Sequence, residues 1–340
     1  MSMEILTTAL EAVLPIVLLI LLGYFLKGRG LFTESFLVTG NKVVFRVCLP
    51  VMLFINVYRV ESFAQIPWDI ILYCVVVVLV IFALGLLTAL AVTPIPQRRG
   101  VLLQCTFRSN FAIIGLPLAA SLGGDAGVAL ASILSAVTIP VFNILAVISL
   151  SVFADEGTKK PGGKKILTDI AKNPLIIGVL LGIVSLVLRE VQLARWGTLL
   201  FSLERDLPSV FSVMNSIKGI TTPFALMMLG GQFRFSAVKG LLKEIVTGTL
   251  WRTVAAPLIG IGGAWLLSTY TPLLRCGMAE YPALIALFGS PVAISSAIMA
   301  REMKGDEQLA TQLVVWTSVV SIVTIFLTAC LMMRWGLLAV

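Results

Sequence analysis

The sequence has no histidine and few charged residues. Asp, Glu, Lys and Arg make up 12% of its 340 residues, about half the share found in a typical soluble domain. The lack of histidine removes the commonest metal ligand and the usual proton shuttle. The five cysteines lie scattered through apolar segments without a paired spacing, which predicts neither disulfides nor a metal site. A membrane-embedded hydrolase would need a nucleophile with its base, or metal ligands. We therefore expect no enzyme activity, no catalytic residue, no metal and no cofactor.

Apolar residues dominate the chain instead. They make up 59% of the sequence, and the mean hydropathy is +1.04. No water-soluble domain of this size hides so much apolar surface, so most of the chain is predicted to lie in lipid. The apolar run 9–26 is long enough to span a bilayer, and no small-residue cleavage site follows it. We interpret it as a first membrane helix and not as a signal peptide.

Apolar windows of about 17–25 residues predict an all-α membrane protein with ten transmembrane helices. The predicted spans are 8–26, 36–57, 69–92, 101–122, 126–152, 174–191, 207–230, 240–268, 279–300 and 308–333.

The ten spans divide into two sets of five. The segment 154–173 is the longest connection and separates residues 1–153 from residues 174–340. Because five is an odd number, the second set must enter the membrane from the opposite side, which makes an inverted repeat. Three features recur in the same order in the two halves: Pro50 and Pro223, Gly115-Leu-Pro117 and Gly289-Ser-Pro291, and Gly124-Asp125 and Gly305-Asp306.

The distribution of Lys and Arg predicts the orientation. Most cations of the connections, including the Lys pairs of the segment 154–173, lie on one side of the membrane if the spans alternate. That side is expected to be cytoplasmic, which places both termini outside the cytoplasm in the plasma membrane. The sequence pI near 9.4 follows from this bias, so no nucleic-acid partner is needed.

Two Gly-x-Pro sequences inside apolar spans predict breaks in the helices. Gly115-Leu-Pro117 and Gly289-Ser-Pro291 occupy corresponding places in the two halves. A break frees backbone groups that only neighbouring protein or a water-filled cavity can satisfy, and paired breaks point to the substrate site of a transporter. The half-helix that restarts after each break directs its positive N-terminal end into the break, where two such ends would seat a carboxylate.

Five cations lie within the predicted spans. Lys42 and Arg46 are close enough to a span end to reach the interface. Lys218 and Arg252 either do the same or pair with Glu244. Arg108 differs, because it precedes Gly115 by two helical turns on the same face. It would either attract and hold an anion, or pair with carbonyls that the break releases.

Acidic residues are absent from the middle of every predicted span, which favours an anion over a cation as the substrate. Neutral polar residues around the breaks complete the predicted lining, although each could instead bond to a neighbouring helix. Asn56, Thr221 and Thr222 are candidates beside Pro50 and Pro223, which we interpret as kinks. The predicted substrate-binding residues are Arg108, Ser109, Asn110, Gly115, Pro117, Asn143, Pro291, Ser295 and Ser296.

Several of these motifs resemble the auxin efflux carrier family of membrane transporters. The run from Arg108-Ser-Asn110 to Gly115-Leu-Pro117-Leu is similar to the fourth span of that family, and its Asn-x4-Gly-x-Pro spacing is the most specific element. Further matches, which extend over essentially the whole chain, are Cys-Leu-Pro50, Pro140-Val-Phe-Asn143, Pro223 to Gly230-Gly231 and Ala300-Arg301-Glu302. The short central connection resembles the compact prokaryotic members.

The resemblance implies two inverted five-helix repeats in which broken helices four and nine cross, as in bile-acid symporters and sodium–proton antiporters. It implies a transport domain of spans 3–5 and 8–10 that moves like an elevator against a scaffold of spans 1, 2, 6 and 7, often in a homodimer. By position, Asn110, Gly115 and Pro117 would form the first crossover. The family's second crossover proline corresponds to Ser295-Ser296, whereas this chain has Pro291. The second break is therefore expected anywhere from Gly289 to Ser296.

The resemblance also implies organic-anion substrates, which are auxin in plants and dicarboxylates such as malate or malonate in bacterial relatives. We therefore predict a secondary transporter for small organic anions that works by alternating access. The alternative is a sodium-coupled symporter of the bile-acid transporter type. The coupling ion, H⁺ or Na⁺, stays open at this point, because backbone carbonyls with neutral side chains can hold Na⁺ without a carboxylate.

Overall fold

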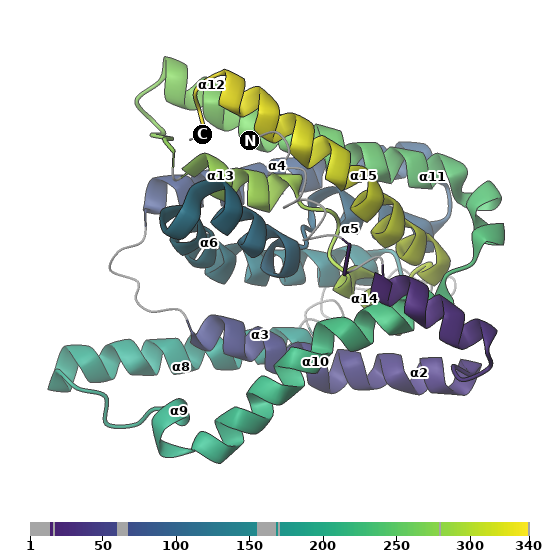
Figure 1. Cartoon of the computed structure of the whole chain (residues 1–340), viewed down its shortest axis with the longest axis horizontal. Helices are drawn as coiled ribbons and strands as arrows, with labels where there is room; N and C mark the ends of the chain where they lie inside the picture. The colour runs from purple at the N-terminus through teal and green to yellow at the C-terminus, as the bar shows by residue number, and fades with distance from the viewer. Residues whose placement is uncertain are drawn as a thin grey trace.

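The computed structural model describes residues 14–15, 18–59, 67–154, 168, 171–278 and 280–338. This part of the chain is helical and contains no β-strand, apart from one isolated bridge (Figure 1). Six of its helices are long and apolar enough to cross a membrane. Two shorter apolar helices cover Leu18–Gly28 and Phe111–Gly124. The chain is therefore a multi-pass membrane protein.

After the helix Leu18–Gly28, the labelled helices, in chain order, are α2 (Glu34–Val43), η1 (Val44–Cys48), α3 (Leu49–Tyr58), α4 (Trp68–Val92), α5 (Pro96–Phe107), η2 (Phe111–Gly115), α6 (Leu116–Val152), α8 (Pro174–Trp196), α9 (Leu203–Asp206), α10 (Pro208–Gln232), η3 (Phe235–Ala237), α11 (Val238–Leu250), η4 (Trp251–Ala255), η5 (Leu258–Gly262), α12 (Gly263–Tyr270), α13 (Glu280–Leu284), η6 (Ile285–Gly289), α14 (Ser295–Glu302) and α15 (Glu307–Arg334).

Seven predicted spans coincide with long helical stretches to within a few residues. The matching predictions are 36–57, 69–92, 126–152, 174–191, 207–230, 240–268 and 308–333. The predicted spans 101–122 and 279–300 are broken helices, as expected, because a non-helical segment separates two helical stretches in each of them. The start of the predicted first span and most of the predicted linker 154–173 lie outside the described residues.

The predicted separation between spans 101–122 and 126–152 is a kink inside α6. Gly124 adopts φ 56° and ψ −148° there, while the helix assignment continues on both sides of it. A positive φ of this kind is favourable only for glycine. Gly124 therefore turns the chain sharply without a loop.

The helices form two groups in space (Figure 1). In one group, α3 packs against α8 and α10, and α10 also packs against α2. In the other, α6 packs against α5 and α13, and α11 packs against α15. Close approach within the first group depends on Gly178 of α8, because a Cβ there would lie 2.5 Å from the carbonyl oxygen of Pro50.

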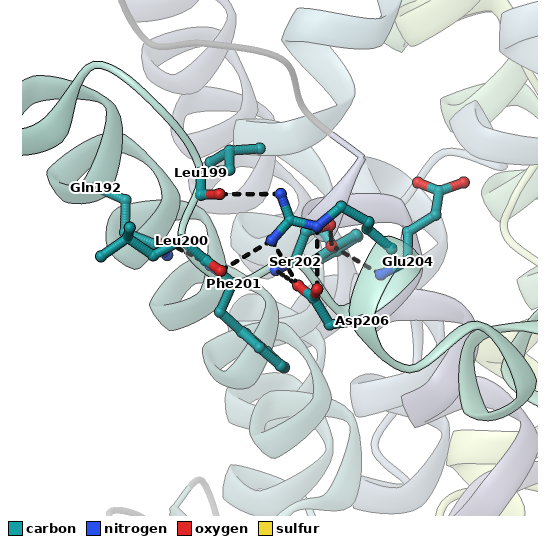
Figure 2. Close-up of polar contacts among 9 residues, drawn as sticks. Gln192, Leu199, Leu200, Phe201, Ser202, Glu204 and Asp206 are labelled. Atoms are coloured by element: carbon teal, nitrogen blue, oxygen red, sulfur yellow. Dashed lines mark hydrogen bonds and ion pairs between the residues drawn. The ribbon is translucent and has the colours of Figure 1, made fainter.

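A hydrogen-bonded loop connects α8 to α10 (Figure 2). The Arg205 guanidinium donates to the carbonyls of Leu199 (3.0 Å) and Leu200 (2.8 Å) and to the carboxylate of Asp206. Asp206 also accepts the backbone N–H of Ser202 at 2.7 Å. The hydrogen bond from Arg205, followed by that from Ser202, lowers the pKa of the Asp206 carboxyl. The loop is therefore ordered by charge-assisted bonds and not by a buried core.

Candidate functional site

The first break lies at Arg108–Asn110. Helix α5 ends at Phe107, Arg108 is extended at φ −84° and ψ 104°, and π-helix η2 begins at Phe111. The expectation of a break at Gly115-Leu-Pro117 is wrong, because Gly115 is helical at φ −65° and ψ −46°. Pro117 stands at the start of α6, which continues directly from η2, so the helix runs through the Gly-x-Pro sequence. The unwound segment thus precedes the Gly-x-Pro sequence.

The second break lies at Ser290–Ile294, within the range expected from the sequence. π-Helix η6 ends at Gly289, and Ser290 is extended at φ −63° and ψ 147°. Helix α14 begins at Ser295. Pro291 therefore lies in non-helical backbone, where it costs no helical hydrogen bond.

The two breaks pair with each other. The backbone N–H of Asn110 donates to the carbonyl of Pro291 at 2.8 Å, and that of Ala293 donates to the carbonyl of Arg108 at 3.2 Å. Unwound backbone in a membrane must be satisfied by protein or by water in a cavity. Each break supplies partners to the other, so neither would be stable alone.

Val292, in the middle of the second break, reinforces this pairing. It forms an antiparallel bridge with Ser109, and its N–H donates to the hydroxyl of Thr317 on α15 at 3.2 Å. The paired breaks are therefore tied to a third helix.

Gly115 has a packing role instead of forming the break. A Cβ at this position would lie 2.8 Å from the carbonyl oxygen of Ala286 and 2.5 Å from the ring of Phe111. Only a residue without a side chain lets η2 approach η6 this closely.

A cavity lies against the paired breaks. Its walls come from α3, the two breaks, α6, the start of α8, and α10. The volume of the cavity is about 60 Å³, taken as the space open to the centre of a water-sized sphere. On the same measure, one water molecule needs only ~10–15 Å³. Most of the lining is apolar. The polar lining residues are Asn56, Arg108, Ser109, Asn110, Asn143, Thr221, Thr222 and Ser295.

Arg108 is the cation of this cavity and is only 3% exposed. Its guanidinium donates to Gln104 Oε1 (2.7 Å), Asn143 Oδ1 (2.7 Å), Ser295 Oγ (2.9 Å) and the sulfur of Met299 (2.7 Å). All four partners are neutral side chains, so the described residues do not form the pairing with released carbonyls that was the alternative to anion binding. The buried positive charge has polar partners but no counter-charge among them.

Asn110 adds a donor to the same cavity. The residue is 4% exposed, and its Nδ2 has no hydrogen-bond partner among the described residues. The hydroxyls of Ser109 and Ser296 are likewise buried without a partner there. Buried polar groups nearly always form hydrogen bonds, so the Asn110 Nδ2 needs an acceptor that the described residues do not supply.

The structure brings some of the predicted site residues together at the cavity and leaves others away from it. Arg108, Ser109, Asn110, Asn143 and Ser295 line it. The predicted residues that do not line it are Gly115, Pro291 and Ser296, and the side chain of Pro117 lies outside the described part of the chain.

Two residues near the breaks were not predicted in the roles that they have. Gln104 accepts a hydrogen bond from Arg108 and lies four residues before it, one helical turn earlier. Side chains at this spacing are neighbours on a helix, so the sequence could have identified Gln104 as a partner of Arg108. Arg252 is 1% exposed, so it does not reach the interface. Nor does it pair with Glu244, whose Oε1 accepts from Arg98 at 3.0 Å.

Comparison with known proteins gives consistent results. The sequence model of a family described as "Membrane transport protein" matches residues 8–328. An uncharacterized transporter of Methanocaldococcus jannaschii is 23% identical over 326 residues, which cover 94% of this chain and 97% of the relative. An uncharacterized transporter of Methanothermobacter thermautotrophicus is 22% identical over 324 residues, which cover 93% and 95%.

Proposed function

The chain belongs to the membrane transport protein family, and we propose that it is a secondary transporter that moves small organic anions across the plasma membrane. The match agrees with the resemblance to the auxin efflux carriers. Carboxylates are the proposed substrate class, and the cavity at the paired breaks is the proposed binding site.

The observation that carries this proposal is the environment of Arg108. A cation buried without a counter-charge is costly, because desolvation is not repaid by an ion pair. A carboxylate entering the cavity would supply the missing charge and accept strong, charge-assisted hydrogen bonds. The unpaired Nδ2 of Asn110 lines the same cavity and offers a second donor to it.

Helix ends add to the positive character of the site. Phe111 begins η2, Ser295 begins α14, and both residues line the cavity. The N-terminal end of a helix carries a partial positive charge and free N–H groups. An anion is therefore favoured over a cation at this position.

The proposed mechanism is an elevator-type motion. The proposed architecture has ten transmembrane helices in two inverted repeats, 1–153 and 174–340, with both termini outside the cytoplasm. Spans 3–5 and 8–10 would move as a transport domain against spans 1, 2, 6 and 7, in a monomer or a homodimer. In support, the cavity is lined both by α3 and α10, which belong to the proposed scaffold, and by the two breaks, which belong to the proposed transport domain.

Thermal stabilisation of the purified protein tests the proposal. A ligand that binds only the native state raises the melting temperature by mass action. We expect stabilisation by one class in a panel of mono- and dicarboxylates, measured with and without Na⁺ at two pH values. If no carboxylate raises the melting temperature, while cations or neutral compounds do, the assignment of an anion as substrate is contradicted. Stabilisation only in Na⁺ would favour the sodium-coupled symporter.

The variant Asn110→Ala locates the site. Loss of one buried hydrogen bond costs about 0.5–1.5 kcal/mol, or up to about 3 kcal/mol when the partner is charged, so we expect roughly 10-fold weaker carboxylate binding or more. Asn215→Ala is the matched control, because Asn215 lies on α10, bonds to Phe211 and Arg59, and does not line the cavity. Equal affinity in the two variants would place the site elsewhere.

A further inference from the structure

We propose that Arg252 is a built-in cation for the paired breaks: its guanidinium occupies the carbonyl ends of both broken helices, so the protein binds no sodium ion there. The consequence for transport, that anion binding is independent of sodium, rests on the proposed function.

The contacts of Arg252 reach both broken helices. It lies in η4 and is 1% exposed. Its Nε donates to the carbonyl of Ser290 at 2.9 Å, and its Nη2 donates to the carbonyls of Phe288 and Leu287. Its Nη1 reaches the carbonyl of Thr106, near the end of α5, at 3.4 Å. One side chain thus bonds to the C-terminal ends of η6 and α5 together.

These carbonyls are the groups that a sodium ion would use. The last carbonyls of a helix lack intrahelical partners and carry a partial negative charge. In transporters with broken helices, such ends and the unwound carbonyls beside them coordinate Na⁺. A second cation beside the buried guanidinium would also be repelled by it.

Other acceptors at the breaks are engaged as well. The carbonyl of Pro291 accepts from the N–H of Asn110, and that of Ala286 accepts from the hydroxyl of Ser290 at 2.6 Å. The side-chain groups left unpaired at the breaks are the Nδ2 of Asn110, which only donates, and the hydroxyls of Ser109 and Ser296. All three can donate to an anion, and Nδ2 cannot bind a metal cation.

The geometry requires arginine in particular. A guanidinium offers five donors in a rigid plane, so it can bond to several carbonyls of two helices at once. Lysine offers three donors from one atom on a flexible stem. It would keep the charge but lose the bridge between α5 and η6.

Direct sodium binding is the first arm of the test. Purified wild-type protein is incubated with ²²Na⁺ at millimolar concentration, and bound label is measured by scintillation proximity. We expect no stoichiometric binding. We also expect equal melting temperatures in NaCl and in choline chloride at the same ionic strength. Binding of one ion per chain, or a sodium-specific rise in melting temperature, would overturn the proposal.

Variants of Arg252 form the second arm. We expect Arg252→Ala to lower the melting temperature by about 5 °C or more, and millimolar guanidinium, well below denaturing concentrations, to restore part of the loss. The melting temperature of Arg252→Lys should lie between those of the wild-type protein and of Arg252→Ala. Arg46→Ala is the control, because Arg46 is exposed on η1; it should change little and show no response to guanidinium. A fully stable Arg252→Ala would contradict the bridging role. If Arg252→Ala does not fold, the ²²Na⁺ binding and the melting temperatures of the wild-type protein still test whether a sodium ion binds at the breaks.

The two proposals can fail separately. A carboxylate that stabilises the protein equally in sodium and choline salts supports both. Sodium-dependent stabilisation by a carboxylate leaves the transport proposal standing and removes this one. Absence of any carboxylate response removes the anion assignment, while the ²²Na⁺ result still tests the role of Arg252.

Discussion

Asn110 and Pro291 come from opposite halves of the chain, and a backbone hydrogen bond of 2.8 Å joins them. Asn110 ends the first unwound segment and Pro291 lies inside the second. Because a proline has no N–H of its own, it contributes only its carbonyl to this pair. The side chain of Asn110 is thereby held at the cavity wall with Nδ2 unpaired. A backbone bond that stabilises the fold thus also positions a candidate ligand donor.

Arg108→Gln separates substrate binding from stability. Hydrogen bonds to charged groups contribute about 1.5–3 kcal/mol, so we expect carboxylate binding to weaken roughly 10- to 100-fold, measured by thermal shift or calorimetry. The apo protein should lose little stability, because a buried cation without a counter-charge is removed. Arg108→Lys should recover part of the affinity, since the charge stays. Full affinity in Arg108→Gln would show that this charge does not bind the anion.

Gly115→Ala and Gly219→Ala form a matched pair. The new methyl group at position 115 would lie 2.8 Å from the Ala286 carbonyl oxygen, whereas nothing lies within 4 Å of a Cβ at position 219. Overpacking typically costs about 1–3 kcal/mol, while glycine to alanine within an open helix gains up to about 1 kcal/mol. We therefore expect a lower melting temperature for Gly115→Ala and an equal or higher one for Gly219→Ala. The reverse order would argue against close packing of η2 on η6.

The loop in Figure 2 provides a pH-dependent prediction. Arg205 lowers the pKa of Asp206, so the carboxylate should titrate below the ordinary value of about 3.9. Its contribution to loop order is present above that value and is lost as the pH falls through the lowered pKa.

A titration of ¹³C-labelled aspartate by NMR measures this shift, with Asp206→Asn to assign the resonance. Arg205→Gln should return the pKa toward its ordinary value. Glu204→Gln should not, because the groups that lower the pKa of Asp206 are Arg205 and the backbone N–H of Ser202. An unshifted pKa in the wild-type protein would contradict the ion pair.

Much of the helical pattern follows from local sequence. The apolar windows over 69–92, 174–191 and 308–333 predict helices that the structure contains nearly unchanged. Membrane helices satisfy all their backbone groups internally, so hydropathy and length suffice to find them. The existence of two breaks was also predictable, because glycine and proline interrupt apolar runs at corresponding places.

The position of the first break was not predictable in the same way. The sequence drew attention to Gly115 and Pro117, yet the chain unwinds at Arg108–Asn110. The helix continues from η2 through Pro117 into α6, and glycine also permits close packing, so neither residue by itself marks the unwound point. For Arg252, the span position alone could not reveal that its partners are carbonyls of residues 287, 288, 290 and 106.

The sequence by itself determined that this is a helical membrane protein. It also determined that Arg108 and several neutral polar residues lie near two interruptions of the helices. Those properties belong to single segments, because hydropathy and helix interruption depend on neighbouring residues. Only the tertiary structure decided where each helix unwinds, which carbonyls Arg252 bonds to and which polar residues line the cavity. Unwound backbone is stable only where distant residues satisfy its hydrogen bonds, and those partners come together only when the two halves of the chain pack.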